Sequence, residues 1–161
     1  MSGGSVSASA QYLTFILGEG IFSLEIVRVR EVLDTMIFTR LPRTPSYLQG
    51  VINFRVSVVP MVDLRLKFGM PAASVTVSTC IIVETTVKGE TLVLGLLADS
   101  SQEVLDLDHG SITPAPRMGA KLDLRFLKGM GRRNDRFIII LDLDRVVSHD
   151  AFDLAQDIRD V

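Results

Sequence analysis

The stretch Leu48–Gly69, LQGVINFRVSVVPMVDLRLKFG, carries the signals that decide the fold. It opens with an apolar, β-branched run, breaks at Phe54–Val56 and continues with a second such run, Ser57–Val62. Runs of this composition favour strands, and two of them so close together favour a β-hairpin. The last residues predict one helical turn, in which Asp63 is the N-cap and Gly69 marks the end.

The same stretch occurs a second time along the chain. Tyr47–Leu64 aligns without a gap on Phe126–Leu143. Upstream, the motif EVLD occurs at Glu31–Asp34 and again at Glu103–Asp106, at a slightly shorter offset, and a proline-containing loop follows each copy. Two matches in the same order favour an internal repeat over a chance likeness between valine-rich strands.

Length and composition bound the class of protein. The chain has 161 residues, 47% of them hydrophobic, which is enough for a sizeable core in one domain or two small ones. A net charge of −2 gives no electrostatic footprint for nucleic acid, and the single cysteine, Cys80, excludes an intrachain disulfide framework. No apolar run has membrane-spanning length, and residues 1–10 lack the regions of a signal peptide. We therefore expect a cytoplasmic protein with a disordered leader at residues 1–10.

Short apolar runs between turn residues predict the other strands. In the first half these are residues 12–17, 21–26 and 30–34, with an extended segment at 38–41 before the hairpin described above. In the second half they are residues 80–84, 92–97, 103–107, 126–130 and 136–143. The turn at Arg133–Asp135 uses residues that tolerate left-handed backbone, and Asp99 is expected as a turn former rather than as a partner contact.

Many short strands at this spacing indicate small barrels or a sandwich. We expect an all-β fold of two five-stranded barrels with a groove between them. Residues 11–70 and part of the C-terminal region would form the first barrel, and residues 71–148 the second. Residues 149–161 would form a short acidic helix that can dock through Phe152, Ala155 and Ile158.

Side chains suited to catalysis are few. His109 and His149 each lie beside an aspartate in a segment expected at the surface, where a solvated role is favoured over a metal or acid–base role. Asp63 and Asp142 hold equivalent places in the repeat, which favours two helix caps over a catalytic pair. Cys80 has no neighbouring cation, which favours an inert thiol. The sequence therefore predicts no enzyme activity, no cofactor and no metal site.

The order of these pieces resembles the CheW family of bacterial chemotaxis coupling proteins. The pieces are YLTFILGEGIFSLEIVRVREVLD, YLQGVINFR, VVPMVDLRLKFG, LLADSSQEVLDLD, ITPAP, FLKGMG and LDLDRVV. The resemblance covers residues 11–148 and implies one CheW-like domain of two SH3-like barrels in a pseudo-repeat. It also implies an adaptor that joins the cytoplasmic tip of transmembrane chemoreceptors to the regulatory domain of the chemotaxis histidine kinase. Such an adaptor would lie in receptor arrays on the inner face of the membrane, without inserting into it.

The resemblance further implies a set of partner-contact positions, which are Val29, Glu31, Gly50, Arg55, Cys80 and Val104. The apolar members are expected to line the groove between the barrels, where a receptor helix would lie. A plain core role stays open for Val29 and Val104, because strand faces are not assigned with certainty from sequence. A solvated role in a turn stays open for Arg55.

The chain departs from the family pattern at one hairpin tip. The family usually reads Asn-Leu-Arg-Gly there, whereas this chain reads Asn53-Phe54-Arg55-Val56. Glycine suits a positive φ, in which valine would be strained. We therefore expect either a different turn or a strained Val56.

Two other functions stay open at this point. One is a CheW-like coupling domain in a non-chemotactic pathway, such as twitching motility or second-messenger control. The other is a ligand-binding or catalytic β-barrel domain of unknown substrate, against which the missing acid–base constellation argues.

Overall fold

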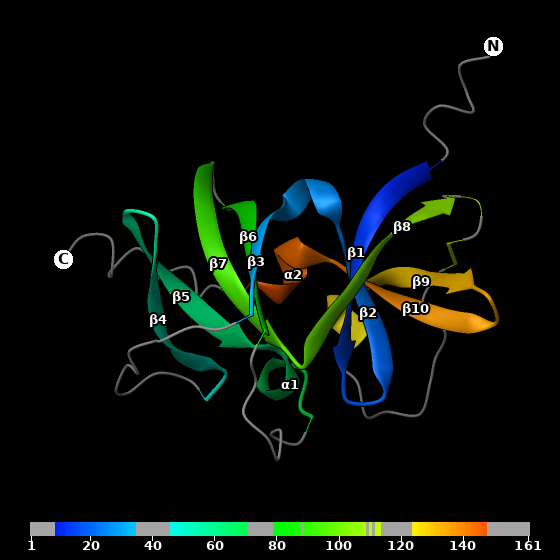
Figure 1. Cartoon of the computed structure of the whole chain (residues 1–161), viewed down its shortest axis with the longest axis horizontal. Coiled ribbons are helices and arrows are strands. Elements are labelled where there is room, and N and C mark those ends of the chain that lie inside the picture. Colours follow the sequence, from blue (N-terminus) through cyan, green and yellow to red (C-terminus); the bar gives the residue numbers. More distant parts are fainter. Residues whose placement is uncertain are drawn as a thin grey trace, which may run out of the picture.

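The computed structural model describes residues 9–34, 46–70, 79–87, 89–108, 110, 112–113 and 124–147. In these ranges the chain forms two five-stranded sheets (Figure 1). Sheet A has the order β8 (Ser100–Asp108), β1 (Ser9–Leu17), β2 (Gly20–Glu25), β10 (Arg136–Leu141) and β9 (Leu127–Arg133). Sheet B has the order β3 (Val29–Leu33), β6 (Thr79–Val87), β7 (Glu90–Ala98), β5 (Ser57–Asp63) and β4 (Leu48–Phe54). The predicted all-β class with two five-stranded units is confirmed.

Short helical segments join or follow the strands. They are η2 (Ile26–Arg28), α1 (Leu64–Lys67), η4 (Leu124–Phe126) and α2 (Leu143–Val146). The side chain of Asp63 caps α1 by accepting from the Leu66 N–H at 3.3 Å, and Asp142 caps α2 by accepting from the Arg145 N–H at 3.4 Å. Both predicted caps are confirmed, and Gly69, with φ of 78°, follows the first helical turn as expected.

The expected division of the chain at residues 70 and 71 is wrong. β1 and β2 belong to sheet A, the strands from β3 to β7 belong to sheet B, and β8 to β10 return to sheet A. Between the described strands, the chain thus crosses from one sheet to the other at η2 and again at Asp99. The first hairpin of each half joins the last three strands of the other half. The long-range pairs that make this connection are β1 with β8 and β2 with β10 in sheet A, and β6 with β3 and β7 with β5 in sheet B.

The internal repeat reappears in the register of the strands. In sheet A, Ile140 of β10 pairs in parallel with Ser23 of β2, and in sheet B, Met61 of β5 pairs in parallel with Gly95 of β7. The alignment of the two hairpin copies sets Met61 on Ile140, and the offset between the two EVLD motifs sets Ser23 on Gly95. Both sheets therefore have the same strand arrangement and register. The β1–β2 hairpin of the first half belongs to sheet A, and the β6–β7 hairpin of the second half belongs to sheet B.

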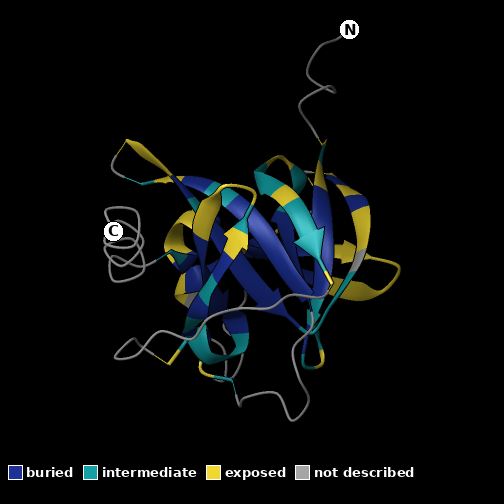
Figure 2. Cartoon of the chain, turned by 60° about the vertical axis from the view of Figure 1, so that its left-hand side comes forward, coloured by how far each residue is buried: buried dark blue, intermediate teal, exposed yellow. Residues whose placement is uncertain are grey.

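Strand alternation divides the core into three clusters. Cys80 and Ile82 face the cluster within sheet B, whereas Ile81 and Val83 face a larger cluster shared by both sheets. A third cluster, around Tyr12, lies within sheet A. A row of phenylalanines with ring centroids 5.3 to 6.1 Å apart runs through the shared cluster: Phe15, Phe22, Phe68 and Phe126. The central strands therefore bury both faces, and the two sheets form one body with a continuous interior (Figure 2).

Some predicted features fall at the limits of the described ranges. β1 begins at Ser9, so the last two residues of the expected leader belong to a strand. The extended segment at 38–41, the C-terminal helix at 149–161 and both histidines lie outside the described residues.

Candidate partner-contact surfaces

Two of the predicted contact residues, Glu31 and Arg55, lie together at one end of sheet B. Glu31 is on β3, Arg55 is in the tip of the β4–β5 hairpin, and the Arg55 Nη2 is 3.6 Å from the Glu31 Oε1. Since β3 and β4 are the two edge strands of sheet B, this ion pair joins the edges of the sheet. The side chain of Arg55 is 72% exposed and that of Glu31 is 41% exposed, so both are open to a partner.

The hairpin tip adopts a different turn from the one expected of a glycine at position 56. The positive φ of 58° falls on Arg55, and Val56 is not left-handed. The Arg55 guanidinium lies over the Phe54 ring, 5.1 Å from its centroid. Val56 is therefore an unstrained and fully exposed apolar side chain beside the ion pair. In sheet A, the equivalent tip has positive φ at Asn134 and Asp135, as their composition predicts.

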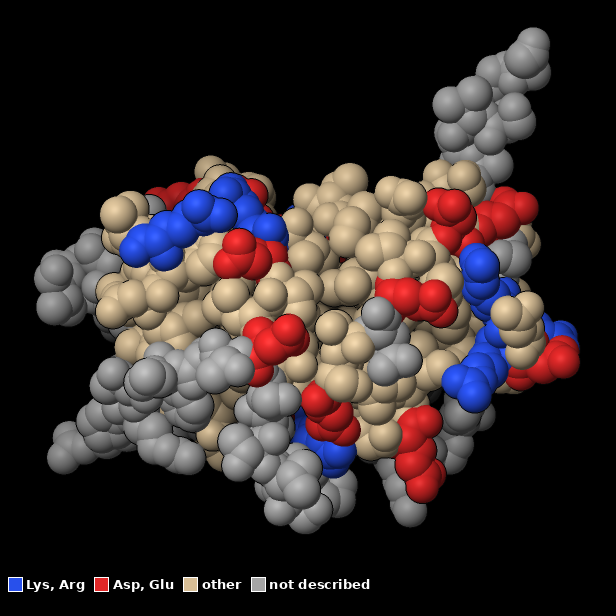
Figure 3. Space-filling model, viewed as in Figure 1, with Lys and Arg blue, Asp and Glu red and all other residues tan. Residues whose placement is uncertain are grey.

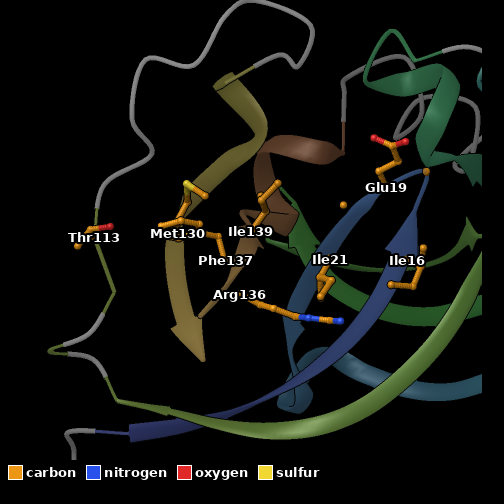
Figure 4. Close-up of a pocket in the computed structure, with 10 residues that line it drawn as sticks. Ile16, Glu19, Ile21, Thr113, Met130, Arg136, Phe137 and Ile139 are labelled. Atoms are coloured by element: carbon orange, nitrogen blue, oxygen red, sulfur yellow. The ribbon is translucent and has the colours of Figure 1, made fainter. Parts of the chain in front are cut away.

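A second surface lies on sheet A, where an open hollow of about 650 Å³ is present (Figure 4). The hollow forms where β2 and β10 separate beyond their parallel pairs, with Thr113 bridged to Met130 at one side. Its apolar lining consists of Ile16, Ile21, Met130, Phe137 and Ile139. Phe137 is 61% exposed, and Arg136 and Glu19 also line the hollow. The sequence did not predict this surface, because four strands from the two ends of the chain build it.

The family model for the CheW-like domain matches residues 11–151. The chain belongs to the CheW-like domain family. Chemotaxis protein CheW of Klebsiella aerogenes is 30% identical over 148 residues, which cover 92% of this chain and 87% of that protein. Chemotaxis protein CheW of Rhizobium meliloti is 33% identical over 136 residues, which cover 84% of this chain and 86% of that protein.

A solved structure gives the same result for the fold. The crystal structure of scaffolding protein TtCheW from Thermoanaerobacter tengcongensis matches with a TM-score of 0.77 and 31% identity. The match covers 88% of this chain and 94% of that one. The two sheets of this CheW-like domain agree with the two SH3-like barrels expected from the sequence.

The other predicted contact positions of this CheW-like domain do not join the Glu31–Arg55 surface. Val29 is half-buried against the shared core, and Gly50 is buried on β4. Cys80 is fully buried, and this burial raises the pKa of its thiol to about 12. A direct partner contact at Cys80 is incompatible with this burial. Val104 is 47% exposed, but it lies on β8 of sheet A.

The described part of this CheW-like domain contains no group of three or more His, Cys, Asp or Glu side chains placed to hold a metal ion. Within the same ranges, no helix has the length and apolar character needed to span a bilayer. Acidic and basic side chains are scattered over the face in Figure 3, so the described residues of this face form no extended patch of one sign.

Proposed function

We propose that this CheW-like domain is a non-catalytic adaptor, which couples the cytoplasmic tip of chemoreceptors to the regulatory domain of the chemotaxis histidine kinase. Its place would be in receptor arrays at the inner face of the membrane. The observation that carries the proposal is the presence of two exposed surfaces on different sheets of one body. One is the Glu31–Arg55 surface with Val56 on sheet B, and the other is the hollow with Phe137 on sheet A.

Each surface combines apolar area with charge at its margin. Exposed Val56 and Phe137 provide apolar area that gains free energy when a partner covers it. The charges of Glu31, Arg55 and Arg136 lie at the margin, where they tune association and the choice of partner. The tips of the β4–β5 and β9–β10 hairpins lie at opposite ends of the molecule in Figure 1, so two partners can be held without competing for space.

The test is capture of each partner alone and of both together by the purified chain. Receptor tip and kinase regulatory domain are the probes, and kinase activity is measured with and without receptor. We expect a three-component complex, and kinase activation only when receptor and kinase are both present. Arg55→His should weaken capture at sheet B and Phe137→Ser should weaken capture at sheet A, each without affecting the other partner. Competition between the two partners for one surface, or ATP hydrolysis by the chain alone, would contradict the proposal.

A further inference from the structure

Asp99 stands at the crossing from sheet B to sheet A and is bonded to both sheets. Its carboxylate accepts from the Arg65 Nε at 2.8 Å and also from Arg65 Nη2, so the ion pair is bidentate. The same carboxylate accepts from the Gly18 N–H at 2.8 Å, and the Asp99 N–H donates to the Ile16 carbonyl at 3.0 Å. Arg65 belongs to α1 at the end of sheet B, whereas Gly18 and Ile16 belong to the first hairpin of sheet A.

The other crossing has a counterpart with the charges reversed. Arg28 of η2 lies 3.8 Å from Asp144 of α2 and donates to the Thr85 hydroxyl at 3.5 Å. Thr85 of sheet B in turn donates to Asp144, at 2.5 Å. The alignment of the repeat, continued by one position, sets Arg65 on Asp144. Each helical turn thus forms an ion pair with the nearby crossing. In α1 the helical residue is the base, Arg65, whereas in α2 it is the acid, Asp144.

The two ion pairs differ in exposure. The side chains of Arg65 and Asp99 are 17% and 23% exposed, whereas those of Arg28 and Asp144 are 38% and 57% exposed. Exposed pairs are weakened by solvent and salt, whereas a bidentate pair with limited exposure keeps both its strength and its geometry. The hydrogen bond from Arg65 lowers the pKa of the Asp99 carboxyl, as expected for a carboxylate held in the charged form. The Arg65–Asp99 pair is therefore the stronger of the two.

We propose that Arg65 and Asp99 are positioning residues, which set the orientation of sheet A relative to sheet B and so the separation of the two contact surfaces. The shared apolar core holds the sheets together, but hydrophobic attraction is non-directional and does not by itself select one orientation. A guanidinium fork bonded to a carboxylate fixes a direction in space. The hydrogen bond from the Gly18 N–H to the Asp99 carboxylate ties the first hairpin of sheet A to this ion pair. The same hairpin forms one wall of the hollow.

The orientation is tested by the distance between spin labels on cysteines that replace exposed Gln11 of sheet A and exposed Val58 of sheet B. Native Cys80 is buried and is not expected to take a label. We expect a narrow distance distribution for the otherwise native chain, and a broader or shifted one for Arg65→Ala and Asp99→Asn. The amide oxygen introduced by Asp99→Asn can still accept from the Gly18 N–H, so this substitution isolates the ion pair. Arg65→Lys, which keeps the charge but loses the fork, should give an intermediate width.

Arg28→Ala is the matched control at the weaker crossing and should leave the distribution unchanged. If Asp99→Asn and Arg65→Ala also leave it unchanged, even with a lower melting temperature, the pair is merely stabilising and the proposal fails. If Arg28→Ala broadens the distribution as much as they do, the preference for the Arg65–Asp99 pair is wrong.

The link to partners rests on the proposed adaptor function and is measured separately. With receptor tip and kinase regulatory domain as probes, Asp99→Asn should leave capture of either one alone within about twofold. Capture of the second partner by the first complex should fall roughly fivefold, a size typical of coupling between two sites. An unchanged second capture would overturn the positioning role. Failure of the native chain to capture either probe would instead overturn the adaptor function, while the label distances would still decide whether the pair sets the orientation.

Discussion

Arg55 reaches from the tip of the β4–β5 hairpin to Glu31 on the opposite edge of sheet B. Sheet A has a similar contact, because Arg133, at the end of β9, donates to the carbonyl oxygen of Asp106 on β8 at 3.4 Å. β8 and β9 are the edge strands of sheet A, as β3 and β4 are of sheet B. In each sheet, an arginine at or beside a hairpin tip thus contacts the opposite edge strand. In sheet B its partner is a carboxylate at ion-pair distance, whereas in sheet A its partner is a backbone carbonyl oxygen.

Substitution of either member of the Glu31–Arg55 pair should affect binding more than stability. Exposed ion pairs contribute about 0 to 1 kcal/mol, so Glu31→Lys or Arg55→His should shift the melting temperature by no more than about 3 °C. Capture of receptor tip or kinase regulatory domain should weaken in both variants. Arg30→His is the matched control and should leave capture unchanged. Arg30 lies on β3 beside Glu31, but its ion pair is with Glu84 and not with Arg55. Normal capture of both partners by both variants would mean that the contact surface lies elsewhere on the molecule.

A glycine substituted at position 55 of the hairpin tip should stabilise the fold, whereas a glycine substituted at position 56 should not. Arg55 has the left-handed φ of 58°, which costs a residue with a Cβ about 1 kcal/mol, whereas Val56 has no such cost. Arg55→Gly should therefore raise the melting temperature by about 2 °C, while weakening partner capture. Val56→Gly should not raise it. Melting curves of the two variants decide this, and a larger gain from Val56→Gly would show that the turn is assigned wrongly.

The Cys80 thiol should be inert in the folded protein. Burial raises its pKa to about 12, so almost none of it is thiolate at pH 8, and reagents have no access to it. A chromogenic disulfide reagent should react with the native chain only at the rate of unfolding, and at once in denaturant. Thr86→Cys, at an exposed position on the same strand, is the control that should react immediately. Rapid reaction of native Cys80 would mean that β6 opens locally.

Gly95 should be intolerant of a methyl group because of Cys80. A Cβ at Gly95 would lie 2.6 Å from the Cys80 Sγ, so either the buried Cys80 side chain or the backbone of the strand would have to shift. Gly95→Ala should reduce the free energy of unfolding by about 1 to 3 kcal/mol, as overpacked core positions do. Adding Cys80→Ala should recover part of that loss. Gly110→Ala is the control, since its nearest neighbour would be 3.7 Å away. Chemical denaturation measures all four chains, and absence of recovery would assign the strain to another neighbour.

The contribution of Asp99 to stability should disappear in acid. The hydrogen bond from Arg65 lowers the pKa of Asp99 below 3.8, so the folded state favours the carboxylate. Its stabilisation is therefore complete above the unfolded pKa and is lost as the pH falls through the folded value. The difference in unfolding free energy between the native chain and Asp99→Asn should be constant near neutral pH and shrink below about pH 4.

Asp63 provides the opposite control for this pH dependence. Burial raises its pKa above 3.8, so its ionised form is disfavoured in the folded protein and folding gains stability as that carboxyl is protonated. Asp63→Asn keeps a capping oxygen and should therefore show its most favourable effect at neutral pH, with the advantage shrinking in acid. Parallel trends for the two substitutions would mean that other carboxylates dominate.

The sequence alone determined the features that depend on neighbours along the chain. Alternating apolar residues and turn residues located the strands, and the positions of Asp63 and Asp142 predicted two helix caps that the structure confirms. The repeat also followed from sequence, because its two offsets reappear as the register of the parallel strand pairs. The strand and cap signals act within a few residues, and the repeat needs only a comparison of two stretches of the same chain, so a single sequence contains the information for all of them.

Only the tertiary structure decided which strands pair, and with them the surfaces of the molecule. The exchange of the first hairpins follows from packing both faces of the central strands, and no local signal distinguishes it from two consecutive units. The same packing buries Cys80, which the family resemblance placed among the contact positions, and brings Glu31 to Arg55 across the edges of sheet B. Side-chain alternation defines two faces for a strand, but it does not tell which face meets a partner strand, the core or solvent. That choice depends on residues far apart in the chain, and the free energy of burying apolar surface decides it.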